Sequence, residues 1–418
     1  MPMPVRSLPV VQNWDCGGCT DCCREYHVYV TAEEKARIEG QGWEKEPGFT
    51  AVSLFQFAGR KQGFRLNHGP DGACVFLGEN GRCRIHAKFG GAAKPLACRL
   101  YPFMLIPAGD HWRVGLRFAC PEAAASRGRP LGQHTADIRA YVAEFEKREN
   151  VAGRTLAPPP LQGKQSVDWS DLDTLMQGLS IVMSDRRDRV ERRLRKALWL
   201  AHTCRQAKFD KISGKRLEDF LSILIGAADP ELPADAAALP PPSGIGRVLF
   251  RQMFALFSRA DSGAIKGRAS RNRLALLMAA IRFARGTGPV PPVNALIPAT
   301  TFEKLEEPLG PLPADCEQML ERYYSVKLHS MQFFGPTNFR HTFWDGLESL
   351  VLTYPVIMWL TRAFVQAMPL PDALLRAVRI TDNNFGFQPL LGSRRQKLGQ
   401  RILSFRDEIP RLVAWYSR

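Results

Sequence analysis

One short stretch is the most informative part of the sequence. It reads CGGCTDCC at residues 16–23, where four of the ten cysteines lie within eight positions. Unbound thiolates this close together would repel one another and oxidise, so a bound cation is the simplest reason for the crowding. Four more cysteines follow between residues 74 and 120, and the last two stand alone at positions 204 and 316. The pattern predicts that the N-terminal part of the chain binds a metal or an iron–sulfur cluster through thiolates.

The first three cysteines of this stretch, Cys16, Cys19 and Cys22, have the spacing C-x2-C-x2-C. Such spacing lets one turning backbone direct three sulfurs at a [4Fe–4S] cluster, and ferredoxins add a fourth cysteine that precedes a proline. Cys120-Pro121 is the candidate for that remote fourth ligand. Because C-x2-C is also the knuckle of structural zinc sites, the spacing alone leaves zinc as an alternative.

Further cysteine motifs follow in order along the chain. They read C-x-F-L from Cys74, C-x-I-H from Cys83, K-P-x-x-C-R-x-Y-P-F over residues 94–103, and C-P at Cys120. Together with C-x2-C-x2-C-C, they resemble the YkgJ-like family of zinc- or iron-chelating CxxCxxCC domains over roughly residues 10–125. Flagellin lysine N-methylase looks like a longer relative in the same group.

The resemblance implies a set of metal ligands made of the clustered cysteines: Cys16, Cys19, Cys22, Cys23, Cys74, Cys83, Cys98 and Cys120. These thiolates would serve one four-cysteine cluster plus a zinc site, two clusters, or one cluster with spare cysteines. Among the histidines near them, His86 is the first alternative ligand. The chain departs from the family pattern before Pro95, where it has a longer insert and Lys94 in place of a common arginine.

Kinship with the methylase would imply transfer of a methyl group from S-adenosylmethionine to a lysine of a protein such as flagellin. Gly244-Ile245-Gly246 lacks a preceding strand and the third glycine of a nucleotide-binding turn, so no donor-binding or catalytic residue is predicted. The competing class is a non-catalytic zinc or redox-sensing module whose basic helical region docks a protein or nucleic acid.

The chain is longer than a single hydrophobic core usually serves. We expect a small irregular α+β cysteine domain at residues 1–130, stabilised by its metal, a linker at 131–170, and a mostly all-α region at 171–418. Proline-rich breaks near 229–244 and 286–313 divide the helical region. Isolated Cys204 and Cys316 are expected to be helix-core residues.

Hydrophobic periodicity predicts individual elements. In the cysteine domain it indicates strands at 26–30 and 113–118 and a helix at 32–38 that Thr31 caps. Farther along, helices are expected over 183–201, 247–259, 271–285, 316–328, 344–367 and 394–415. The aromatic-rich segments 332–343 and 380–387 are expected to pack turns, with a pocket lining as the alternative.

The net charge of +16 lies mainly outside the cysteine domain, since 17 Lys and Arg against 12 Asp and Glu in residues 1–130 leave +11 for the remainder. Seven of these cations crowd into residues 186–196. A basic surface of this kind attracts nucleic acid or acidic protein, or is simply a soluble helical face, and we favour the second interpretation.

The sequence also predicts neither a signal peptide nor a membrane span. The opening residues contain no uninterrupted apolar segment of the kind found in signal peptides. The most apolar stretch, residues 347–360, is shorter than a bilayer span and is interpreted as one buried helix. We therefore expect a cytoplasmic protein with no membrane span, in which paired cysteines bind metal rather than form disulfides.

Overall fold

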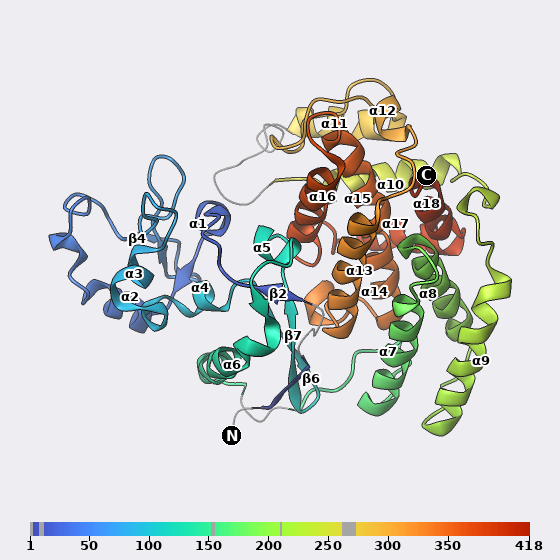
Figure 1. Ribbon diagram of the computed structural model, residues 1–418, viewed down its shortest axis with the longest axis horizontal. Coiled ribbons are helices and arrows are strands. Elements are labelled where there is room, and N and C mark those ends of the chain that lie inside the picture. Colours follow the sequence, from blue (N-terminus) through green and yellow to red (C-terminus); the bar gives the residue numbers. More distant parts are fainter. Residues whose placement is uncertain (1–2, 8–11, 152–154, 210, 261–272) are drawn as a thin grey trace.

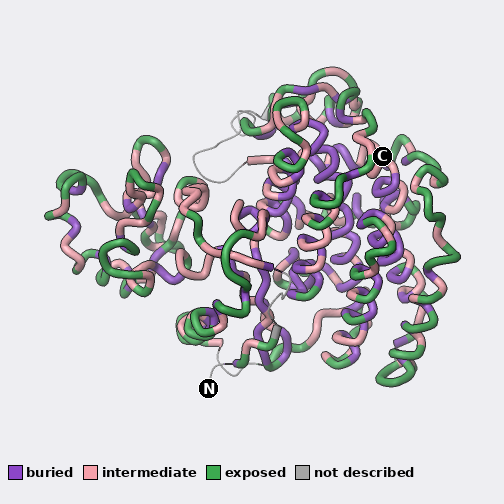
Figure 2. The backbone as a smooth tube through the Cα atoms, viewed as in Figure 1, coloured by how far each residue is buried: buried purple, intermediate pink, exposed green. Residues whose placement is uncertain are grey.

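The computed structural model describes residues 3–7, 12–151, 155–209, 211–260 and 273–418. Figure 1 shows a small lobe that carries the cysteine-rich segment beside a larger body of helices. Buried residues fill the helical body, whereas most of the lobe is exposed or only half-buried (Figure 2). The expected fold class, an irregular α+β cysteine domain followed by a mostly helical region, is confirmed.

The small lobe has few regular elements and a core of its own. Its strands form one antiparallel sheet in the order β3-β5-β4. The elements are α1 (Asp21–Glu25), β3 (Tyr29–Val30), α2 (Ala32–Glu39), β4 (Phe55–Phe57), β5 (Phe64–Leu66), α3 (Arg84–Phe89) and α4 (Leu96–Leu100). The small core consists of seven buried side chains: Val30, Ile38, Trp43, Phe49, Leu66, Phe76 and Ile85.

Helix α2 begins as the sequence predicts. The Thr31 hydroxyl accepts a hydrogen bond from the Glu34 backbone N–H, and the Glu34 carboxylate accepts one from the Thr31 backbone N–H in return. This capping box satisfies two backbone donors that the helix itself cannot pair. The other carboxylate oxygen of Glu34 accepts from the Leu96 backbone N–H at 2.7 Å and so ties α2 to α4.

A second sheet joins the lobe to the helical body. It has the order β1-β7-β6, with β1 (Val5–Ser7) parallel to β7 (His111–Leu116) and β6 (Phe103–Ala108) antiparallel to it. β2 (Asn13–Trp14) pairs separately with β8 (Arg129–Pro130). α5 (Pro121–Ala124) and α6 (Thr135–Glu149) follow this sheet.

The two hydrophobic cores do not coincide with the expected domains. Side chains of β6, β7 and α6 belong to the large core of the helical body, not to the small core. Residues 131–170, expected as a linker, contain α6, whose Ile138 and Val142 are buried in the large core. The change from one core to the other falls between Cys98 and Phe103.

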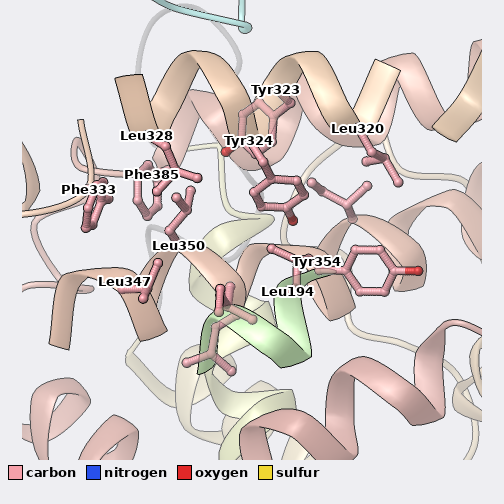
Figure 3. Close-up of a cluster of buried hydrophobic side chains, with 14 of the residues drawn as sticks. Leu194, Leu320, Tyr323, Tyr324, Leu328, Phe333, Leu347, Leu350, Tyr354 and Phe385 are labelled. Atoms are coloured by element: carbon pink, nitrogen blue, oxygen red, sulfur yellow. The ribbon is translucent and has the colours of Figure 1, made fainter. Parts of the chain in front are cut away.

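The helical body contains α7 (Trp169–Ser184), α8 (Val190–Arg205), α9 (Lys215–Glu231), α10 (Gly244–Phe257), α11 (Arg273–Arg285), α12 (Phe302–Glu306), α13 (Ala314–His329), α14 (Phe343–Val351), α15 (Thr353–Phe364), α16 (Leu370–Asn384), α17 (Arg394–Phe405) and α18 (Glu408–Tyr416). Short 3-10 turns occur at Trp43–Lys45, Gly91–Ala93, Leu131–His134, Ala236–Ala238 and Pro336–Asn338. Figure 3 shows leucine and tyrosine side chains from α8, α13, α14 and α15 packed together in the large core.

Several predicted helices are divided in the structure. The expected helix over 344–367, including the apolar stretch 347–360, is two helices that meet at Leu352. Pro355 lies in the first turn of α15, where its missing N–H costs no helical hydrogen bond. The expected helix at 394–415 is likewise interrupted at Asp407, which has a left-handed φ of 56°. Met183 belongs to α7 rather than to α8.

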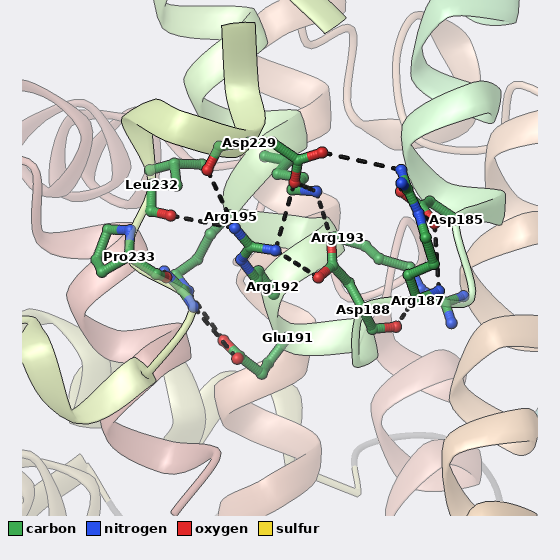
Figure 4. Close-up of polar contacts among 11 residues, drawn as sticks. Asp185, Arg187, Asp188, Glu191, Arg192, Arg193, Arg195, Asp229, Leu232 and Pro233 are labelled. Carbon is green, nitrogen blue, oxygen red and sulfur yellow. Dashed lines mark hydrogen bonds and ion pairs between the residues drawn. The ribbon is translucent and has the colours of Figure 1, made fainter. Parts of the chain in front are cut away.

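The basic run at residues 186–196 is largely neutralised within the structure (Figure 4). On α8, Arg195 is buried and donates to Glu191 at 2.9 Å, and Arg193 lies 3.2 Å from Glu321. The Lys196 ammonium, also buried, forms ion pairs with Asp188 and Asp229. The expectation of a soluble basic face is therefore wrong for the three buried cations, because carboxylates of α8 itself, of the loop before it, of α9 and of α13 lie beside them.

Within the described ranges, no helix combines the length and the apolar character needed to cross a bilayer. All ten cysteines lie in those ranges and all are free thiols. Cys204 of α8 and Cys316 of α13 are buried in the large core, as the sequence predicts.

Candidate metal centre

The eight clustered cysteines come from four separate segments of the chain. Cys22 and Cys23 lie on α1, and Cys16 and Cys19 precede it in the same loop. The other four lie in the turns that lead into α3, on α4, and at the residue before α5. Tertiary contacts therefore decide which thiols meet.

Glycine allows the cysteine loop to pack closely on a neighbouring turn. Gly18 has a left-handed φ of 73°, which other residues adopt only with strain. A Cβ atom on Gly81 would lie 2.9 Å from the Gly18 carbonyl oxygen. The loop at 16–20 and the turn at 78–82 thus meet backbone to backbone, without room for a side chain at Gly81.

Four cysteines, which we call the second thiol group, gather beside the small core: Cys23, Cys74, Cys83 and Cys98. The Cys74 backbone N–H donates to the Cys23 carbonyl at 2.8 Å, and Leu77, which bridges to Cys83, donates to the Cys74 carbonyl at 2.8 Å. The Cys98 thiol interacts electrostatically with the three other thiols. Cys74, Cys83 and Cys98 also pack against the small core.

The remaining four, which we call the first thiol group, are Cys16, Cys19, Cys22 and Cys120. Cys19 interacts electrostatically with Cys16 and Cys120, and Cys22 interacts with Cys16 and Cys19 but most strongly with Cys23 of the second group. The Asp15 backbone N–H donates to the Arg127 carbonyl at 3.1 Å, and a Cβ atom on Gly17 would lie 2.9 Å from the Glu122 carboxyl carbon. This contact brings Cys16 and Cys19 to Cys120, the residue before α5. The predicted remote partner of the C-x2-C-x2-C loop is therefore next to it in space.

The two groups adjoin at α1, where the Cys22 and Cys23 sulfurs are 4.0 Å apart. No three His, Cys, Asp or Glu side chains of the described ranges are already arranged to hold a metal ion. The thiols share a neighbourhood, and loading with metal would have to draw the sulfurs closer together.

Burial opposes ionisation of most of these thiols. It raises the pKa of Cys19 to about 11 and that of Cys74 to about 12, and the neighbouring thiols add to both shifts. Burial also raises the pKa of Cys98 and of Cys120. Without a cation these groups hold their protons at neutral pH, so metal binding would have to displace protons. The chemistry of the donor set fits a thiophilic metal.

Two residues outside the predicted ligand set, Lys94 and Trp14, change the pKa of nearby thiols. Lys94 favours the thiolate forms of Cys23, Cys74 and Cys98 by its charge. The pKa of Cys23 is lowered to about 7, first by the contact with Cys22 and then, against burial, by Lys94 and Arg24. The sequence signal for Lys94 was its place in the K-P-x-x-C motif, which marks it as close to Cys98 along the chain.

Trp14 is the corresponding neighbour of the first thiol group. Its buried indole N–H is directed at Cys120, and this contact opposes the effect of burial by favouring the Cys120 thiolate. N–H groups directed at sulfur are one way in which proteins tune iron–sulfur clusters. Sequence spacing gave no signal for Trp14, because β2 brings it to Cys120 from more than a hundred residues away.

The candidate histidines occupy different surroundings. His86 lies on α3, where burial first and then Lys94 and Arg82 lower its pKa, and no cysteine contributes to that shift. His68 bridges to Cys74, and neither of its buried ring nitrogens has a hydrogen-bond partner within the described residues. The lowered pKa of His68 comes first from burial, and no thiol contributes to it either.

Helix α16 holds two segments that carry cysteines of the first thiol group. Arg379 forms an ion pair with Asp21 of α1 and donates to the Ala119 carbonyl at 3.2 Å. Asp382 accepts from the Ala119 backbone N–H at 3.1 Å and forms a fully buried ion pair with Lys327. Through these contacts α16 fixes the residue before Cys22 and the residue before Cys120.

A neighbouring residue of α16 completes the junction. The Asn383 side-chain oxygen accepts from the Tyr26 hydroxyl at 2.8 Å and from Arg117 at 2.9 Å. The Arg117 guanidinium also lies 3.7 Å from the centre of the Phe387 ring. The aromatic-rich segment 380–387 therefore contacts the cysteine lobe through Tyr26 and Arg117.

Comparison with known proteins agrees with this site. Residues 15–122 match the family CxxCxxCC, described as a "putative zinc- or iron-chelating domain". Comparisons with the curated proteins and with the solved structures found no match. The matched range contains all eight cysteines of the two thiol groups and leaves the helical body outside it. Residues 15–122 thus match the model of the CxxCxxCC family, as their motifs predict.

Proposed function

We propose that residues 15–122 hold two metal centres, one in each thiol group. The proposal is supported by the electrostatic neighbours of the thiols, since Cys98 interacts with Cys23, Cys74 and Cys83, and Cys19 interacts with Cys16 and Cys120. Four thiolates are a complete ligand set for zinc or for an iron–sulfur cluster. A reducing compartment such as the cytoplasm would suit ten free thiols.

For the first thiol group we favour a [4Fe–4S] cluster. Its three loop cysteines have the ferredoxin-like spacing, and its fourth precedes Pro121. The indole N–H of Trp14, which is directed at Cys120, supports this choice, because a ligating thiolate would accept its hydrogen bond. For the second thiol group, zinc and a second cluster are both compatible with four thiolates.

Metal analysis of anaerobically purified protein tests the proposal. We expect a broad absorbance band near ~400 nm, with iron and sulfide in equal amounts. Cys19→Ala should abolish the cluster of the first group and spare the second metal, whereas Cys98→Ala should do the reverse. Cys204→Ala is the matched control, because its thiol is buried in the large core, and it should keep both metals.

Two results would contradict these assignments separately. Colourless protein with zinc alone would overturn the iron–sulfur cluster but leave two four-thiolate sites in place. Equal loss of all metal in Cys19→Ala and Cys98→Ala, with Cys204→Ala unaffected, would overturn the division into two independent centres.

Methyl transfer from S-adenosylmethionine to a protein lysine stays a prediction, because it rests on the resemblance to flagellin lysine N-methylase. Incubation of metal-loaded protein with labelled donor and flagellin should label the flagellin if the kinship is functional. Labelling that persists in Cys19→Ala would show that the first thiol group takes no part in that reaction. No transfer by fully loaded protein would favour the non-catalytic zinc or redox-sensing module.

Docking of nucleic acid by the helical region has less support than the net charge suggests. Arg193, Arg195 and Lys196 are buried in ion pairs and so are not available to phosphates. Binding to duplex DNA should therefore be weak, and it should fall steeply with salt if it occurs through the remaining surface cations.

A further inference from the structure

We propose that a cavity between the cysteine lobe and the helical body binds a small anionic molecule that carries a carboxylate or phosphate group. The cavity has a volume of about 230 Å³. It lies between α1, the end of α10, a loop at 294–296 and α16. Drug-sized ligands occupy sites of roughly 300–1,000 Å³, so this one suits a smaller molecule.

The charge of the lining favours an anion. Four arginines line the cavity, Arg24, Arg259, Arg376 and Arg379, against two carboxylates, Asp21 and Glu25. Arg379 and Asp21 neutralise each other in an ion pair. The Arg24 guanidinium reaches Asp71, but that pair is exposed at 3.3 Å and therefore weak.

Arg376 is the cation best placed for a ligand. It is half-buried on α16 and forms no ion pair or hydrogen bond with any described residue. Its guanidinium lies 5.6 Å from the centre of the Phe364 ring, which holds the side chain without using its N–H donors. A guanidinium held in this way can bind a carboxylate or phosphate through two parallel hydrogen bonds.

Unused amide groups supply further polar contacts. Asn294 is only 5% exposed, and its side-chain oxygen accepts from the Leu296 backbone N–H at 2.9 Å. Its side-chain NH₂ donates to no described residue, so this donor can reach a ligand. The Asn383 NH₂ is also unused, because the contacts to Tyr26 and Arg117 go to its oxygen. These donors match the oxygens of an anion.

The cavity shares a wall with the candidate metal centre. Helix α1 contributes Asp21, Arg24 and Glu25 to the cavity and Cys22 and Cys23 to the two thiol groups. Ala119, the residue before Cys120, lines the cavity as well. A bound ligand would therefore be in contact with α1, the helix that carries one thiol of each group.

Titration calorimetry on metal-loaded, full-length protein tests the site, with inorganic phosphate and glutamate as the two probes. Low-salt buffer is needed because ions screen such contacts. We expect saturable binding of at least one probe, and the probe that binds identifies the group as phosphate or carboxylate. Arg376→Gln should weaken binding about tenfold or more, since a charge-assisted hydrogen bond is lost. Asn294→Asp should weaken it too, by placing a negative charge in the cavity.

Arg395→Gln is the matched control, because Arg395 is an exposed arginine of α17 that does not line the cavity, and it should bind like the unaltered protein. Absence of saturable binding by either probe would overturn the proposal, as would unchanged affinity in both cavity variants. Metal content measured on the same samples separates this outcome from the proposed metal centres. The proposed metal centres are tested by the metal content and not by the binding of the probes.

Discussion

Lys94 acts at the scale of a single residue on three thiols of the second group. Its charge opposes the effect of burial on the pKa of Cys74 and Cys98 and helps to lower that of Cys23. Lys94→Met should raise these thiol pKa values, so protons compete better with the metal. We expect metal to be released at a higher pH during acid titration, with the release followed by a chromogenic chelator. Lys88→Met, on the neighbouring α3, should leave the midpoint unchanged, and equal midpoints in both variants would contradict this role.

His341 provides a second test at the residue scale, in the helical body. Burial, helped by the charge of Lys397, lowers its pKa to about 4, whereas the unfolded chain has the ordinary value of about 6.5. A lowered pKa in the folded state means that the unfolded state takes up the proton first. The free energy of unfolding should therefore fall as the pH drops from about 6.5 to about 4, by about 3 kcal/mol from this group alone. Urea denaturation at both pH values should show a smaller fall in His341→Gln, and an equal fall would refute the assignment.

At the scale of elements, the junction between α16 and the cysteine lobe depends on one buried ion pair. Asp382 pairs with Lys327 of α13 at 2.5 Å and also accepts from the Ala119 backbone N–H. Lys327→Met leaves a buried carboxylate without its cation and should cost about 3–5 kcal/mol in the free energy of unfolding. The double variant Lys327→Met, Asp382→Asn keeps an acceptor for Ala119 and removes the charge, so it should recover part of that loss. Denaturation curves of the two variants decide the matter: equal stability would contradict a penalty from the unpaired charge.

At the scale of the whole molecule, the two cores differ in how far they depend on metal. The small core contains seven buried apolar side chains, whereas the large core draws on most helices of the body. Removal of metal should therefore accelerate hydrogen exchange within residues 28–98 and leave α13 to α15 protected. Mass spectrometry of metal-loaded and metal-free protein measures this difference. Uniform acceleration over the chain would show that one cooperative unit includes both cores.

Interactions between sequence neighbours determined what could be predicted without a structure. The capping box of α2, the helical periodicity of α10 and α13, and the C-x2-C-x2-C loop involve residues a few positions apart. The match of residues 15–122 to the family model could also be predicted, because each cysteine motif is short and the motifs follow one another in a fixed order along the chain. Local spacing fixes these features, whatever the rest of the chain does.

Only the tertiary structure decided which of the eight thiols meet, because each group is closed by segments up to about a hundred residues apart. The same holds for the ion pairs that join α8 to α9 and α13 and for the contacts of α16 with Asp21 and Ala119. The sequence by itself determined that cysteine thiols would gather near the N-terminus. Long-range packing divided them into two groups and set a cavity beside them, since side chains meet only where the folded backbone brings their segments together.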